Sequence, residues 1–247
     1  MGCKVNYFDL PILCKFPTRK PSFRTTTIAF SSTAQNKQEY VPGSTTAAAI
    51  ETQELKTGSC SVSFKTLGAC KLGISRYPDF EYNAEGGTGT GTGTGTTITG
   101  GDSDNEISVC FDIKTLYIPP LTSATTKFLG LPLPPFLKID IIPELFNGII
   151  NQESGKVELE FTANFWFSVG TIYRAPPLLV KTVLTSEESK GKNRRGRGER
   201  LNKEGKCRLA GVATVDPIDD FLMNSFLSLP TECLANLNAV ISFSDSY

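Results

Sequence analysis

The sequence of 247 residues contains no histidine, one tryptophan and two methionines. The missing imidazole excludes Ser-His-Asp and Cys-His nucleophilic centres, histidine-ligated zinc and histidine-containing iron sites. None of the seven cysteines forms a C-x-x-C pair, the spacing typical of structural zinc sites and of thioredoxin-type exchange. The sequence therefore predicts no metal centre and no cofactor, and it leaves carboxylates as the strong candidates for acid and base chemistry.

Long apolar runs are also missing. The most apolar stretch, residues 128–150, is interrupted by three charged side chains and four prolines. A membrane-spanning helix needs about 20 uninterrupted apolar residues. The sequence therefore predicts a soluble or peripheral protein rather than one with a spanning helix.

The net charge of zero is an average over unlike segments. Residues 1–38 carry six basic side chains and one acid (net +5), and residues 190–208 carry nine basic side chains and two acids (net +7). The remaining residues must therefore sum to −12. This distribution predicts a mildly acidic body with two basic segments, not a surface that binds nucleic acid throughout.

The basic N-terminal segment has the composition of an organellar targeting peptide. Half of the sixteen residues in 18–33 are serine or threonine, acids are absent there, and prolines within residues 11–21 oppose a long helix. We therefore predict a plastid transit peptide and linker over residues 1–58, and a chloroplast location in the stroma or at the thylakoid. The alternatives are an unstructured cytosolic tail and acylation at Gly2, although Asn6 departs from the myristoylation pattern.

After Gly58 the dominant hydrophobic period is two, the period of strands that bury one face and expose the other. The clearest run is residues 157–169, in which seven apolar side chains alternate with mostly polar ones. Strands with one buried and one solvent-exposed face are typical of antiparallel sheets. Further strands are expected over residues 60–64, 71–77, 107–113, 137–142, 178–185 and 206–215.

One segment changes to the helical period. Asp216 and Pro217 form a good helix start. The aspartate side chain caps the first turn, and proline has a fixed φ and lacks the backbone N–H that would have no partner at this position. Apolar residues then recur at steps of three and four until Pro230. This pattern predicts an amphipathic helix packed on the sheet, whereas residues 233–243 fit either a strand or a helix.

Two segments have low complexity. Residues 87–97 consist of glycine and threonine alone, alternating up to Thr96. The charged, glycine-interrupted segment that follows the strand at 178–185 predicts a long hairpin loop. Glycine-rich backbone loses much conformational entropy when it becomes ordered. The expected organisation is therefore a single β-rich domain over residues 59–247, with disordered insertions at 86–103 and 186–205.

Apolar, proline-rich segments are the most prominent candidates for binding. Residues 116–121 and 128–137 place large apolar side chains among prolines, which cannot join a central hydrogen-bond ladder. Such segments either cover an edge of the core or form a patch for a lipid surface, an apolar ligand or a protein partner. The expected ligand or membrane contacts are Phe128, Leu129, Leu131, Leu133, Phe136 and Leu137.

The basic segment 186–205 is a second candidate surface. Its cations would attract anionic lipid headgroups or other phosphates, although a solvated loop without a partner has the same composition. No aromatic side chain lies within residues 186–207 to stack on bases, so nucleic acid is not an expected partner. The expected contacts with an anionic surface are Lys190, Lys192, Arg194, Arg195, Arg197 and Arg200.

Carboxylates offer the one route to catalysis. Asp140 and Glu144 flank Pro143 beside apolar neighbours, where a raised pKa would permit acid–base chemistry. No nucleophile, base and stabilising group can be combined into a catalytic constellation, so we expect a protein that is not an enzyme.

The predicted fold is mainly β (or α+β): an antiparallel sheet, curved or barrel-like, with one amphipathic helix near the C-terminus packed on it. Over residues 60–243 this architecture resembles helix-grip and lipocalin-type pocket proteins, in which a curved sheet encloses an apolar cavity; no functional residues are carried over. The leading hypothesis is a non-catalytic plastid protein that binds a lipid or pigment, or docks peripherally on plastid membranes. The alternatives are an assembly or scaffold protein for plastid complexes and a carboxylate-based enzyme.

Overall fold

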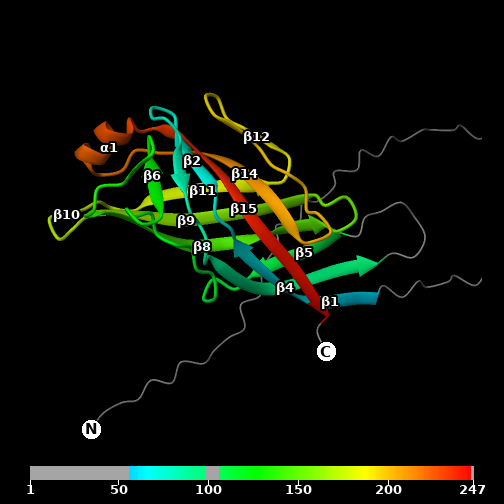
Figure 1. The fold of residues 1–247 in the computed structure, drawn as a ribbon. Coiled ribbons are helices and arrows are strands. Elements are labelled where there is room, and N and C mark those ends of the chain that lie inside the picture. Colours follow the sequence, from blue (N-terminus) through cyan, green and yellow to red (C-terminus); the bar gives the residue numbers. More distant parts are fainter. Residues whose placement is uncertain (1–55, 98–105, 246–247) are drawn as a thin grey trace, which may run out of the picture. The chain divides into compact units, whose positions relative to one another are not determined.

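Antiparallel strands dominate the computed structural model, which describes residues 56–97 and 106–245 (Figure 1). Eight strands form a closed ring whose order is also the chain order: β1 (Lys56–Thr66), β4 (Thr88–Thr97), β5 (Glu106–Phe111), β8 (Leu137–Asn151), β9 (Val157–Val169), β11 (Leu178–Thr185), β14 (Lys206–Val215) and β15 (Thr231–Asp245). The ring closes because β1 pairs with β4 on one edge and with β15 on the other. The predicted mainly β fold with a curved, barrel-like antiparallel sheet is confirmed.

Short strands continue the wall at one end of the ring. They are β2 (Cys70–Ile74), β3 (Phe80–Tyr82), β6 (Thr126–Phe128) and β7 (Leu131–Pro132). β2 pairs with the first part of β15, β3 with β2, β6 with β3 and β7 with β6. Two backbone hydrogen bonds of 2.9 Å between Leu121 and Ile139 join this branch to β8. Three further strands lie outside the ring: β10 (Tyr173–Arg174), which pairs with β9, and the hairpin β12 (Glu188–Lys190) and β13 (Arg195–Arg197).

The strands follow the period of two that the sequence predicts. In β9 the inward-facing Val157, Leu159 and Ala163 are fully buried, while the glutamates between them face solvent. β8 contains a bulge, because its register with β9 shifts between Pro143 and Leu145. The extra residue keeps the apolar side chains on both sides of the bulge directed into the ring. Pro143 is tolerated there, since β5 pairs only with the later part of β8 and needs no N–H from it.

The helix near the C-terminus is shorter than the sequence predicts. α1 (Phe221–Leu227) begins after Asp220, whose carboxylate accepts a 2.8 Å hydrogen bond from a backbone N–H of the first turn. The predicted start at Asp216 was therefore wrong. The Asn224 side chain holds the preceding turn outside the helix, through hydrogen bonds of 3.0 and 2.7 Å to both backbone groups of Ile218. The ambiguous segment that follows α1 is part of β15.

The glycine-threonine tract is strand β4, so the prediction of disorder was wrong for residues 88–97; residues 98–105 lie outside the described residues. Its glycines share the inner face of the ring with Val62 of β1, and the threonines at 88, 90, 92 and 94 face outward. A methyl group on Gly91 would lie 2.8 Å from the Cα atom of Phe111 on β5. The glycines therefore allow close approach of the neighbouring strand, and the β-branched threonines suit the exposed face.

The end of the ring that contains β1, β4 and β5 is filled by aromatic side chains. Phe64, Phe111 and Phe146 pack with ring centroids 4.7–5.9 Å apart, and Phe161 lies 5.9 Å from Phe146. Aliphatic residues that are fully buried, among them Ile150, complete this cluster. We refer to this part as the filled end. At the opposite end lie α1, β6 and β10 (Figure 1).

Replacement of a tract glycine tests this arrangement. Gly91→Val is expected to lower the free energy of unfolding by about 3 kcal/mol, because the added methyl groups meet the backbone of β5. Thr92→Val, on the exposed outer face of the same strand, should change it by less than about 0.5 kcal/mol. Denaturant unfolding followed by circular dichroism measures both values. Equal stabilities of the two variants would contradict the inward placement of the glycines.

Candidate functional site: an apolar cavity

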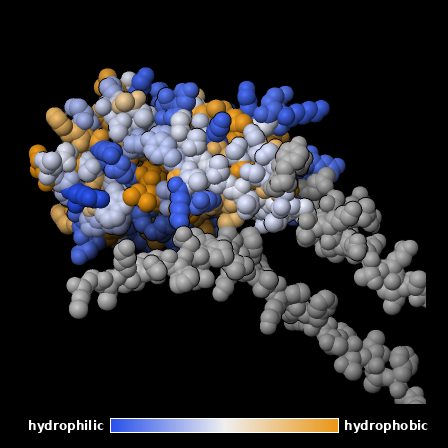
Figure 2. All heavy atoms as spheres, turned by 90° about the horizontal axis from the view of Figure 1, so that it is seen from below, coloured by the Kyte–Doolittle hydropathy of each residue, from blue (hydrophilic) through white to orange (hydrophobic). Residues whose placement is uncertain are grey.

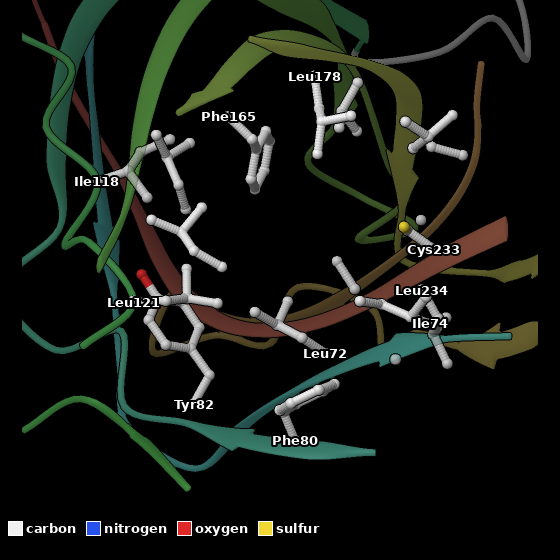
Figure 3. A pocket seen from close by; sticks show the side chains of 18 of the residues that line it. Leu72, Ile74, Phe80, Tyr82, Ile118, Leu121, Phe165, Leu178, Cys233 and Leu234 are labelled. Atoms are coloured by element: carbon white, nitrogen blue, oxygen red, sulfur yellow. The ribbon is translucent and has the colours of Figure 1, made fainter. Parts of the chain in front are cut away.

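A cavity of about 420 Å³ lies inside the ring, between the aromatic cluster and α1. Phe64, Phe146 and Phe161 form its floor, and Met223 and Leu227 of α1 border it from the other end. Figure 3 shows the labelled side chains from β2, β3, β9, β11 and β15 around an open space. The volume falls within the range of about 300–1,000 Å³ that is usual for small-molecule pockets.

The solvent exposure of inward-facing side chains also shows where the cavity lies. On β9, Val157 and Leu159 are fully buried at the filled end. Farther along the same face, Phe161 and Phe165 remain partly exposed although they point into the ring. Close-packed interiors leave few such positions. The inner surface is therefore unfilled over the half of the ring that α1 covers.

The lining is apolar and carries no charged residue among those that the structure describes. Six of the lining side chains carry a hydroxyl group, and four of these donate to backbone carbonyl groups: Tyr82 to Pro119, Thr66 to Ala84, Thr182 to Val212 and Tyr77 to Phe226. Burial raises the pKa of the Tyr82 hydroxyl, and it raises the pKa of the Cys233 thiol to about 11. Both groups are thus neutral near pH 7, and the cavity holds no charge at that pH.

The six predicted apolar contacts divide into two groups. Phe128, Leu133 and Leu137 line the cavity. The side chains of the other three point to solvent, with exposed fractions of 70% for Leu129, 70% for Leu131 and 72% for Phe136. The proline-rich segment 128–137 therefore covers an edge of the core with some side chains and exposes an apolar patch with others.

The cover of the cavity is held at its edge by Tyr77, in the turn between β2 and β3. Its hydroxyl donates a 2.6 Å hydrogen bond to the carbonyl oxygen of Phe226, and its ring packs against Phe226 and Phe128. The neighbouring Arg76 donates to the Ser228 hydroxyl at the end of α1. These contacts are exposed, so they fasten α1 less firmly than buried packing would.

The basic segment is ordered, so the prediction of disorder over residues 186–205 was wrong. The hairpin β12–β13 packs on the outer face of β14 and β15, where Val212 N–H donates a 3.0 Å hydrogen bond to the Ser189 hydroxyl. A methyl group on Gly196 would lie 2.7 Å from Leu234 Cδ1. Glycine in this segment therefore permits close packing.

Glu232 anchors the tip of this hairpin. Its carboxylate accepts hydrogen bonds of 2.6, 2.7 and 2.9 Å from the backbone N–H groups of Lys192, Asn193 and Arg194. These bonds lower the pKa of the Glu232 carboxyl, because they stabilise its charged form. The Arg194 guanidinium in turn reaches the turn between β2 and β3, with a 2.6 Å ion pair to Asp79.

Half of the predicted anionic-surface contacts have acidic partners. Lys190 pairs with Glu188, Arg200 with Glu187 and Arg194 with Asp79. The remaining three are exposed and form no ion pair among the described residues: Lys192, Arg195 and Arg197. The positive surface that the hairpin offers is thus smaller than its composition predicts.

The two carboxylates considered for catalysis lie on the outer face of β8. Asp140 forms a 2.7 Å ion pair with Lys138 and borders an open hollow of about 390 Å³ beside Trp166. Glu144 accepts a 2.5 Å hydrogen bond from the Asn164 side chain. Neither carboxylate borders the apolar cavity.

In the part of the chain that the structure describes, cysteine, aspartate and glutamate side chains form no group of three or more that would hold a metal ion. Within residues 56–97 and 106–245, no helix combines the length and the apolar character needed to cross a membrane.

The Glu232 anchor predicts a pH-dependent stability. A carboxyl whose pKa is lower in the folded than in the unfolded state stabilises the fold above its unfolded pKa, and this contribution is lost as the pH falls through the folded pKa. Glu232→Gln should therefore lower the midpoint of thermal unfolding at pH 7, and the difference from the wild type should shrink on acidification below about pH 4. Thermal scans from neutral to acidic pH measure this. A difference that stays constant over the whole range would show that the charge of Glu232 is not responsible.

Sequence reasoning found most of the strands that build the wall but not the hollow inside it. One signal was present: small residues occupy inward positions on the last two strands, at Gly211, Ala213 and Ala235. Comparison with protein-family models, curated proteins and solved structures gives no match to this chain. The cavity is therefore interpreted from its own geometry.

Proposed function

We propose that the chain is a non-catalytic plastid protein that holds the hydrocarbon part of a lipid or pigment inside the ring. The observation that carries this proposal is the uncharged cavity of about 420 Å³, in which most of the hydroxyl groups already donate to backbone carbonyls. A polar ligand group that lost its hydration there and found no free partner would cost about 1–3 kcal/mol. Apolar surface gains about 25 cal/mol per Å² on entering such a site.

The size of the hollow supports a resident ligand. The hollow is partly open to solvent, since two of its lining side chains, Tyr117 and Phe226, are 55% and 47% exposed. A bound hydrocarbon would remove the remaining apolar wall from water, which contributes about 25 cal/mol per Å². A methylene group fills about the space of a water molecule, near 30 Å³, which leaves room for on the order of a dozen carbons.

Recovery of a bound molecule tests the proposal directly. Protein purified from plant tissue without detergent should carry an apolar molecule that organic extraction releases and mass spectrometry identifies. After extraction, the empty protein should bind the neutral fluorescent probe N-phenylnaphthylamine and unfold at a higher temperature in its presence. An extracted protein that neither binds the probe nor gains thermal stability would contradict the proposal.

A cavity-filling substitution connects the probe to the cavity. Ala235→Phe points into the hollow and should weaken probe binding by at least about tenfold without lowering the unfolding temperature of the empty protein. Thr214→Phe adds the same ring on the exposed outer face of β14 and should leave probe binding unchanged. Fluorescence titration compares the two. Equal affinities of both variants would place the probe elsewhere.

The plastid location is proposed from the composition of residues 1–58, of which residues 1–55 lie outside the described residues. A fluorescent protein fused behind residues 1–58 should enter chloroplasts of transformed leaf cells. A cytosolic or nuclear signal from this fusion would remove the plastid part of the proposal and leave the cavity argument intact.

A further inference from the structure

Exposed apolar side chains gather at the end of the ring that α1 covers. Ile172 is 92% exposed, Phe221 86%, and Leu222 56%. Together with the three exposed residues of the proline-rich segment they form what we call the apolar rim: Leu129, Leu131, Phe136, Ile172, Phe221 and Leu222. The segments that carry these residues, around β6, β10 and α1, lie at one end in Figure 1. Figure 2 shows hydrophobic residues at the left edge of the molecule, the end where α1 and β10 lie in Figure 1.

The apolar rim and the cavity are built by the same segments. Phe128 lines the cavity, and the next residue, Leu129, belongs to the apolar rim. In α1, Met223 points into the cavity while Phe221 points to solvent. Phe226 does both, because it lines the cavity and is 47% exposed. Phe128 and Phe226 therefore connect the wall of the cavity to the apolar rim, and the Tyr77 side chain lies against both of them.

The charges beside the apolar rim are of both signs. Three acids, Asp216, Asp219 and Asp220, precede α1, and cations lie on the neighbouring strands. Lys138 is paired with Asp140, and Lys127 faces Glu81 across β6 and β3. Arg174 lies over the ring of Trp166, 4.6 Å from its centroid. No strong field of one sign results, so an attraction at this end comes from apolar contact and is insensitive to salt.

We propose that the apolar rim docks on an uncharged or zwitterionic lipid bilayer, and that the cavity exchanges its hydrocarbon ligand with that bilayer. The partner is a bilayer because the side chains stand on separate turns and one helix face. Fluid acyl chains accept such side chains without a matching shape. Docking also spares an apolar ligand the passage through water. The exchange step rests on the proposed function, whereas the docking step does not.

Flotation of the full chain with phosphatidylcholine vesicles tests the docking step. The wild type should float with the vesicles, equally at about 0.05 and 0.5 M salt. Leu129→Ser/Ile172→Ser/Phe221→Ser should reduce the partition coefficient by about 100-fold, because three inserted side chains lose their apolar contact. The matched control, Ile142→Ser/Leu179→Ser/Val183→Ser, changes residues of 43–51% exposure on the outer face of β8 and β11 and should float like the wild type.

Three results would overturn the docking step: a wild type that does not float, a rim variant that floats unchanged, or binding that high salt abolishes, which would assign it to the basic segments. The wild type could instead sediment as a dimer that the rim substitutions dissociate, and fail to bind vesicles. That result would identify a second copy of the chain as the partner. Binding of N-phenylnaphthylamine in the same variants separates the two proposals. A rim variant that binds the probe but does not float supports docking as a distinct step, whereas a wild type that floats but binds no probe would overturn the cavity proposal alone.

Discussion

Every other feature of the fold depends on the hydrogen bonding of β15 along both of its edges. One edge pairs with β14 from Thr231 to Val240, and the other pairs first with β2 and then with β1. The backbone bends between β1 and β2, where Ala69 has a φ of 57° and Leu67 N–H still bonds Asn238 at 2.8 Å. β1 and β2 therefore act as one irregular strand, which pairs with both the first and the last part of β15 and so closes the sheet along its length. Without this closure the sheet would have free edges and no interior.

The two halves of the interior differ because of the side chains that meet there. At the filled end, the phenylalanines of β1, β5 and β8 pack beside the glycines of β4: Phe111 stacks on Phe146, and Phe64 meets both rings edge-on. Toward α1, β14 and β15 present Gly211, Ala213 and Ala235, and the cavity lies against these small residues. Large residues opposite glycine produce a packed core, and small residues opposite a curved wall produce a hollow.

The sequence predicted the strands in which apolar and polar residues alternate regularly. The prediction was wrong for the glycine-rich segments. Residues 157–169, 178–185 and 206–215 are strands with the predicted bounds, because their alternation of apolar and polar side chains reflects a surface with one buried face. The glycine-rich segments were predicted to be disordered, since glycine is entropically costly to order. That cost is local, whereas the benefit of close approach to β5 or to β15 arises only in the assembled sheet. The division of the proline-rich segment between cavity and solvent was equally out of reach, because it depends on the turn that follows β6 and on the helix beside it.

The dipeptide repeat of β4 gives the strand a particular tolerance to changes in length. Because a strand alternates its faces with a period of two, adding or deleting one Gly-Thr unit within residues 88–95 keeps the glycines inside the ring and the threonines between them outside. Gain or loss of a single residue would instead turn threonines toward the aromatic cluster. The face pattern of β4 is therefore preserved by changes of two residues and lost by changes of one.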